Sequence, residues 1–72
     1  MANFVERINE LKIKNNVMQK DCANACGITV RGYQYYEKGM KEPTLSKLIA
    51  LADFFNVSLD YLTGRSDNPD IR

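Results

Sequence analysis

Two short helix-like segments follow each other with only a tight turn between them, and this arrangement limits the folds that the sequence can adopt. Gly27 ends a short helix-like segment, since glycine enters the left-handed backbone region at little cost and commonly stands just past a helix end. Thr29 follows, and a threonine before a helix accepts a backbone N–H of the first turn. The predicted helices, 19–26 and 30–38, are thus joined by a tight turn. This arrangement predicts a helix-turn-helix motif.

Apolar spacing predicts three further helices around this pair. Phe4, Ile8 and Leu11 recur at i, i+4 and i+7, which predicts a first helix over about 3–14. Thr44 is expected to cap a fourth helix that ends before Asn56. The apolar positions of that helix are Leu45, Leu48, Ile49, Ala52 and Phe55.

Ser58 is expected to cap a short fifth helix over 59–63, which Gly64 ends. The sequence shows no strand-like alternation of apolar and polar residues, so it predicts an all-α domain of five short helices. At 72 residues, one domain is expected, over 1–64. Residues 65–72 form a polar tail with a proline, predicted to be a frayed end or the start of a linker.

Composition limits the function classes. No apolar run approaches the roughly 18 residues of a membrane span, and the N-terminus mixes charged with apolar residues, unlike a secretory signal. We therefore expect a cytoplasmic protein without a membrane partner. The chain has no histidine, no activated nucleophile and no glycine-rich phosphate loop, so we expect neither an enzyme nor a cofactor.

Cys22 and Cys26 are the two cysteines, spaced i, i+4 on one face of the second predicted helix. Zinc sites take four ligands, and two thiols without a histidine cannot supply them, so no metal site is predicted. Small buried apolar residues are the favoured interpretation of both cysteines, and a redox pair is the alternative.

The charge distribution is more informative than the net charge of +1. Six basic and two acidic residues between 12 and 41 give that segment a charge of +4. Residues 1–11 carry −1 and residues 42–72 carry −2. A basic middle with acidic flanks is typical of a modest nucleic-acid-binding surface, and a solvated mixed-charge surface is the alternative.

From Val17 to Pro43 the sequence resembles, without a gap, the phage-repressor and Cro-like (XRE-type, lambda-repressor-like) helix-turn-helix family. The residues that carry the resemblance are Gln19, Ala23, Gly27, Ile28, Thr29, Tyr33, Tyr36, Glu37–Gly39 and Glu42–Pro43. The stretch 44–64 is similar to the last two helices of the same family. The resemblance implies a compact lambda-repressor-like domain over about 4–64 that binds double-stranded DNA.

The third predicted helix divides into two faces. Tyr33, Tyr36 and Glu37 face the body of the domain, at i, i+3 and i+4. In helix-turn-helix proteins the N-terminal residues of the second helix meet base edges. The candidate base-reading residues are Val30 for a thymine methyl group, Arg31 for guanine, and Gln34 for adenine or a phosphate.

Candidate contacts to the DNA backbone lie at the start of the second helix, along the third and in the loop after it. They are Gln19, Thr29, Tyr35, Lys38, Gly39, Met40 and Lys41. The resemblance also implies a pair between Lys12 and Glu37, where the family more often has arginine in place of the lysine. Two solvated surface charges are the alternative for that pair.

Gly32 costs helix stability, and two explanations are open. Its missing side chain either lets the helix approach the groove closely or is merely tolerated at the surface.

The predicted function is sequence-specific DNA binding by a bacterial or phage-encoded, nucleoid-associated transcriptional regulator. The prediction is a repressor that binds a near-palindromic operator as a homodimer, because a domain this small makes few base contacts. An antitoxin-type module that also binds a protein partner is the alternative. Tyr61 on the last helix is expected either at a dimer face or in ordinary packing.

Overall fold

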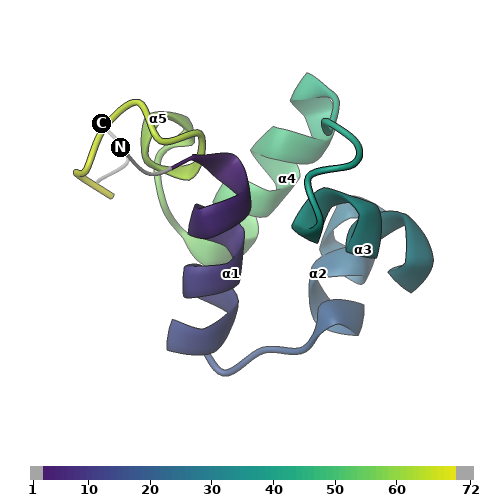
Figure 1. Cartoon of the computed structure of the whole chain (residues 1–72). Helices are drawn as coiled ribbons and strands as arrows, with labels where there is room; N and C mark the ends of the chain where they lie inside the picture. The colour runs from purple at the N-terminus through teal and green to yellow at the C-terminus, as the bar shows by residue number, and fades with distance from the viewer. Residues whose placement is uncertain (1–2, 70–72) are drawn as a thin grey trace.

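The computed structural model describes residues 3–69, which form five helices and no strand. The helices are α1 (Phe4–Lys14), α2 (Gln19–Cys26), α3 (Val30–Glu37), α4 (Leu45–Phe55) and α5 (Leu59–Leu62). α2 packs on α3 and α4, α1 on α3 and α5, and α4 on α5, so α3 lies on the side of the molecule away from α5 (Figure 1). The predicted all-α, five-helix fold is confirmed, and each predicted boundary lies within one residue of the observed one.

The turn between α2 and α3 forms as predicted. Gly27 has φ 71° and ψ 32°, in the left-handed region, and a Cβ there would meet no atom within 4 Å. The requirement for glycine is therefore one of backbone conformation. Thr29 caps α3, since its hydroxyl oxygen accepts the N–H of Gly32 at 3.1 Å. Together they place the start of α3 two residues after the end of α2.

Two helix starts are less regular. Met18 has no capping oxygen, but the Asp21 carboxylate accepts the backbone N–H of Met18 at 2.9 Å. Thr44 stands at the N-cap position of α4, as predicted, yet its side chain makes no capping bond. Its hydroxyl lies 3.2 Å from that of Ser46 instead. The predicted capping role of the Thr44 side chain is therefore wrong.

The core lies where all five helices meet, and Tyr33 is the largest fully buried side chain in it. Its members are Ile8, Leu11, Cys22, Ala23, Cys26, Tyr33, Tyr36, Leu51, Ala52, Phe55, Val57 and Leu62. Fully burying a leucine or isoleucine side chain contributes about 1.5–3 kcal/mol. Each helix supplies at least one buried side chain to this cluster, so the helices hold together through a single core.

The predicted apolar face of α4 is partly wrong. Leu45 is 66% exposed and Ile49 is 41% exposed, whereas Leu51 is fully buried. The observed stripe runs through Leu48, Leu51, Ala52 and Phe55, again spaced i, i+3, i+4 and i+7. α4 is apolar on most of its circumference, so periodicity alone allowed two neighbouring stripes.

Both cysteines are buried and unbonded, which confirms the interpretation as small core residues. Burial raises the pKa of the Cys22 and Cys26 thiols above their ordinary value. A raised pKa keeps a thiol protonated and unreactive at neutral pH. Residues 3–69 contain no cluster of three or more acidic or cysteine side chains that could hold a metal ion.

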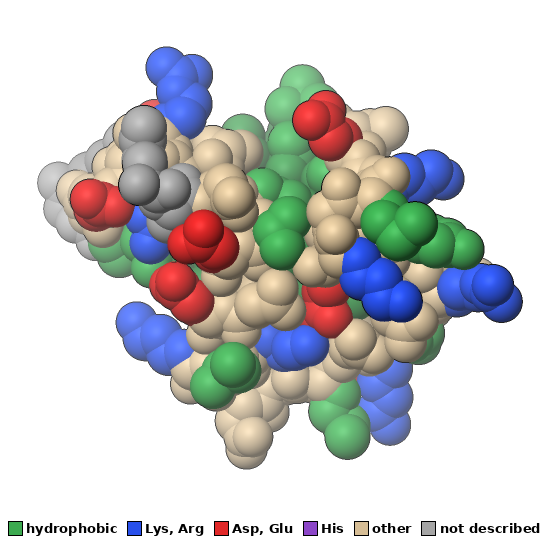
Figure 2. Space-filling view, viewed as in Figure 1, with side chains coloured by type: hydrophobic (Ala, Val, Ile, Leu, Met, Phe, Trp, Pro, Cys, Tyr) green, Lys and Arg blue, Asp and Glu red, His purple; other side chains and the backbone are tan. Residues whose placement is uncertain are grey.

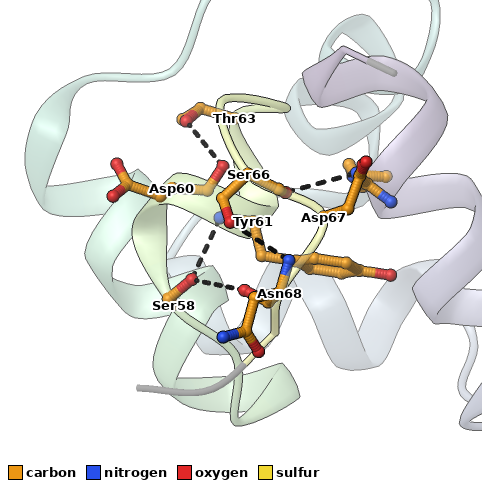
Figure 3. A network of polar contacts seen from close by, with 8 residues as sticks. Ser58, Asp60, Tyr61, Thr63, Ser66, Asp67 and Asn68 are labelled. Carbon is orange, nitrogen blue, oxygen red and sulfur yellow. Dashed lines mark hydrogen bonds and ion pairs between the residues drawn. The ribbon is translucent and has the colours of Figure 1, made fainter. Parts of the chain in front are cut away.

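The described part of the C-terminal tail folds back on α1 and α5. Arg7 on α1 donates to the Asp67 carboxylate at 2.7 Å, and its guanidinium lies 4.0 Å from the centre of the Tyr61 ring. Ser58, just before α5, donates its backbone N–H to the Pro69 carbonyl at 3.0 Å. The Ser58 hydroxyl donates to the backbone carbonyl of Asn68 at 3.3 Å (Figure 3). Tyr61 is thus engaged in packing within the domain, and whether the tail begins a linker stays a prediction.

No helix among residues 3–69 combines the length and apolar character that crossing a membrane requires.

Candidate nucleic-acid interface

The outward face of α3 is a shallow hollow. It is lined by Val30, Arg31, Gln34, Tyr35 and Lys38. All three predicted base-reading residues therefore lie together with two predicted backbone contacts. Arg31 and Lys38 are exposed, and Val30 is 39% exposed although it is apolar. An exposed valine beside a long cation and an amide offers the mixed contacts that base edges require.

Arg31 and Tyr35 lie one helical turn apart on this face and touch. The Nε of Arg31 donates to the Tyr35 hydroxyl at 3.4 Å, which is a long and weak bond. It occupies Nε alone. The two terminal nitrogens of Arg31 stay available for a bidentate contact, and the hydroxyl hydrogen of Tyr35 can donate to a phosphate.

A chain of polar side chains links α1, α3 and α2 behind this face. Lys12 donates to Glu37 Oε2 at 2.7 Å, and Gln19 donates to Glu37 Oε1 at 2.7 Å. Gln34 in turn donates to Gln19 Oε1 at 3.0 Å. The Lys12 and Glu37 side chains are only 21% and 10% exposed, so the pair is not a pair of solvated surface charges. The lysine reaches the carboxylate without the bidentate fork of arginine.

Tyr33 lies against this polar chain from the core side. Burial, followed by the neighbouring Cys22 thiol, raises its pKa well above the ordinary tyrosine value. The Cys22 thiol and the Glu37 carboxylate lie near its hydroxyl, but among the described residues the hydroxyl makes no hydrogen bond of good geometry. Tyr33 therefore stabilises the position of α3 by packing in the core. Its ring stands edge-on to the ring of Tyr36, with the centroids 6.4 Å apart.

A second hollow adjoins the first at the start of α2. It is lined by Lys12, Val17, Met18, Gln19, Lys20 and Val30. Lys20 is exposed and Met18 is 63% exposed, yet sequence reasoning assigned neither to the interface. Their position in the first turn of α2, beside Gln19, was the available signal. The two hollows share Val30, so they form one continuous surface across α2 and α3.

The loop after α3 differs from its expected role in one respect. Gly39 and Met40 were predicted to offer backbone groups to a phosphate, but their N–H groups already donate to the carbonyls of Tyr36 and Tyr35. Both bonds close the end of α3, at 3.1 and 3.0 Å. In this segment the exposed side chains of Lys38 and Lys41 are better placed to meet a phosphate.

Gly32 has a structural role that neither expectation included. A Cβ at this position would lie 3.3 Å from the capping hydroxyl of Thr29 and 3.8 Å from Ile28 Cδ1. The first distance is tighter than ordinary packing, so a side chain would compete with the cap. The glycine thus leaves room for the bond that fixes the first turn of α3.

Charge is distributed as the sequence predicted. In the view of Figure 2, lysine and arginine side chains surround the side formed by α2 and α3, whereas most acidic side chains lie over α1 and the C-terminal segment. The acidic Glu37 is paired within the polar chain, so it does not cancel the surrounding cations at the surface. The outward face of α3 is therefore both hollow and basic.

A protein-family model described as helix-turn-helix (HTH_3) matches residues 8–62. The chain belongs to the helix-turn-helix family. This is a family of transcriptional regulators, which agrees with the expectation that the chain is not an enzyme. The match runs from Ile8, within α1, to Leu62 at the end of α5, and it includes the residues of both hollows.

Individual helix-turn-helix proteins support the same assignment. The chain is 34% identical over 93% of its length to the HTH-type transcriptional regulator YobD of Bacillus subtilis, of which it covers 60%. It is 31% identical over 89% of its length to the cryptic phage CTXphi transcriptional repressor RstR of Vibrio cholerae, of which it covers 58%. The chain thus spans about three fifths of the length of these curated relatives.

A solved structure of a transcriptional regulator from Listeria innocua is similar to this helix-turn-helix domain. The two superpose with a TM-score of 0.80 at 33% identity, over 85% of this chain and 57% of that one. The resemblance to the phage-repressor and Cro-like family is confirmed.

Proposed function

We propose that the chain is a sequence-specific DNA-binding transcriptional regulator that acts as a repressor. The observation that carries the proposal is the basic hollow on α3, formed by Val30, Arg31, Gln34, Tyr35 and Lys38 in a helix-turn-helix domain. α3 lies in the major groove, where Val30, Arg31 and Gln34 meet base edges. The similarity to the repressor RstR supports repression.

The DNA backbone is contacted on both sides of α3. Phosphates meet side chains at the start of α2 and α3 and after α3, with Gly39 and Met40 close to the strand. These side chains are Gln19, Thr29, Tyr35, Lys38 and Lys41. Contacts of this kind fix the register of the helix on the duplex but carry no sequence information.

The regulator binds as a homodimer on a near-palindromic operator, with half-sites about 34 Å apart. It works in the cytoplasm of a bacterium, which the bacterial regulators similar to it support. The antitoxin alternative stays a prediction. No feature of the described residues favours it.

Selection of the tightest-binding duplexes from a random pool tests the proposal. A near-palindrome should be enriched, and titration of that duplex should end at two protein chains per operator. Lys38→Ala should weaken binding to all sequences and reduce the salt slope by about one unit. Arg65→Ala, which removes an exposed arginine beyond α5, should change neither. If no sequence is enriched at either of two salt concentrations, the proposed function is wrong.

A further inference from the structure

The amide of Gln34 is held in one orientation by a chain of hydrogen bonds that begins at a charge. Lys12 and Gln19 both donate to Glu37, and Gln34 donates to Gln19. These hydrogen bonds connect α1, α2 and α3, which are labelled in Figure 1, so the Gln34 side chain is tied to the body of the domain.

The direction of every bond follows from the ionised carboxylate of Glu37. A carboxylate only accepts hydrogen bonds, so Gln19 must turn its NH₂ group toward it. The Oε1 of Gln19 then faces Gln34 and needs a donor there. Gln34 must therefore turn its own NH₂ group toward Gln19. Flipping either amide would set two donors or two acceptors against each other.

One N–H and the Oε1 of Gln34 are left for a ligand. Gln34 lines the hollow on α3 beside Arg31, on the face where α3 would meet base edges. In the major groove, adenine presents an acceptor at N7 and a donor at its N6 amino group. Guanine presents two acceptors, N7 and O6, and would need two donors. A glutamine that keeps one donor and one acceptor matches adenine and opposes guanine.

We propose that Gln34 selects adenine over guanine in the operator, and that Gln19 and Glu37 act as positioning residues that impose this choice. A glutamine free to rotate could turn both amide hydrogens toward guanine, whereas this one has already committed a hydrogen to Gln19. The inference rests on the proposed function, since it names the base that one residue of the proposed surface reads.

The first test uses the parent protein and modified operators. Selection with parent and with Gln34→Ala identifies the base pair whose preference the variant relaxes. Replacing adenine at that position by guanine, by 7-deazaadenine or by purine removes part of the matching pattern. Each of these base replacements should weaken binding of the operator by the parent protein. Replacement by guanine should weaken it by about 5- to 150-fold, the discrimination expected of a good bidentate contact. Equal binding to adenine and guanine would overturn the inference.

The second test addresses the positioning residues. Gln19→Met keeps the length of the side chain but removes the acceptor that holds Gln34. The ratio of adenine to guanine binding should fall at least threefold toward one, while the preference at the base read by Arg31 stays unchanged. An unchanged ratio would show that Gln19 does not position Gln34. Thermal melts by circular dichroism verify the fold of each variant, and the modified-base series needs no variant protein.

The possible failures are distinguishable. If no duplex is enriched by parent, the proposed function is wrong and the inference falls with it. If a duplex is enriched but Gln34→Ala weakens all sequences alike, Gln34 contacts a phosphate, which overturns the inference and leaves the proposed function standing.

Discussion

The Lys12–Glu37 pair offers a stability test that does not require DNA. Glu37 accepts two hydrogen bonds of 2.7 Å, one from a cation and one from an amide, and its side chain is 10% exposed. Glu37→Gln keeps the shape, but it removes the charge and one of the two acceptor oxygens. The new amide hydrogens must then face Lys12 or Gln19, which are donors.

The expected loss follows from these contacts. A hydrogen bond to a charged group contributes about 1.5–3 kcal/mol, and Glu37→Gln forfeits about one of them. A domain of this size has a total stability of about 4–11 kcal/mol. The variant should therefore melt about 6–24 °C lower, at about 4–8 °C per kcal/mol.

Urea denaturation followed by circular dichroism measures the loss directly. Glu42→Gln is the matched control, since Glu42 is an exposed carboxylate in the loop after α3, and it should change stability by less than about 0.5 kcal/mol. A double-mutant cycle with Lys12→Met should give a coupling of about 0.5–3 kcal/mol that persists in high salt, because partly buried pairs are screened weakly. If Glu37→Gln loses no more stability than Glu42→Gln, the pair does not hold α1 to α3.

Three further predictions concern the cap, the core tyrosine and the thiols. In a Thr29→Ala background, Gly32→Ala should stabilise the domain by about 1 kcal/mol, because alanine has the higher helix propensity. In the parent, where the Thr29 hydroxyl lies close to the new Cβ, the gain in urea melts should be clearly smaller. Equal gains in the two backgrounds would show that the cap is not crowded. Tyr33→Phe should keep or raise stability by up to about 1 kcal/mol, since its buried hydroxyl lacks a partner, whereas a loss above about 1 kcal/mol would reveal one. Because burial raises the folded-state pKa of Cys22 and Cys26, the native protein holds these protons more tightly than the unfolded chain. The contribution of the two thiols to stability should be complete at pH 7 and should decline as the pH rises above about 8.5, the ordinary thiol pKa. The urea midpoint should therefore fall more between pH 7 and pH 10 in the parent than in a Cys-to-Ala double variant, and an equal change in both proteins would contradict this prediction.

Local signals were sufficient to predict the helices. Glycine and asparagine at helix ends, Thr29 as cap and apolar spacing are properties of short segments, and such segments form the same structure here as elsewhere. The choice of buried stripe on α4 was not local. Leu51 rather than Leu45 faces the core because α2 and α5 cover that side, and only the packed structure shows this.

The candidate site was predictable in its members but not in its connections. A helical wheel separates Arg31 and Gln34 from Tyr33, because all three lie on one helix. The bond between Gln34 and Gln19 joins residues 15 positions apart on two helices, so no spacing rule indicates it. The close contact of 3.3 Å that a Cβ at Gly32 would make with the Thr29 hydroxyl likewise depends on the cap geometry.

The reading of DNA sequence by the outward face of α3 is the proposal on which the other proposals depend. Its most direct test compares the duplexes that parent, Arg31→Ala and Arg65→Ala enrich from one random pool at one salt concentration. We expect the same near-palindrome for parent and Arg65→Ala. For Arg31→Ala we expect the loss of a guanine preference at one position of each half-site. Identical preferences in all three proteins would contradict it.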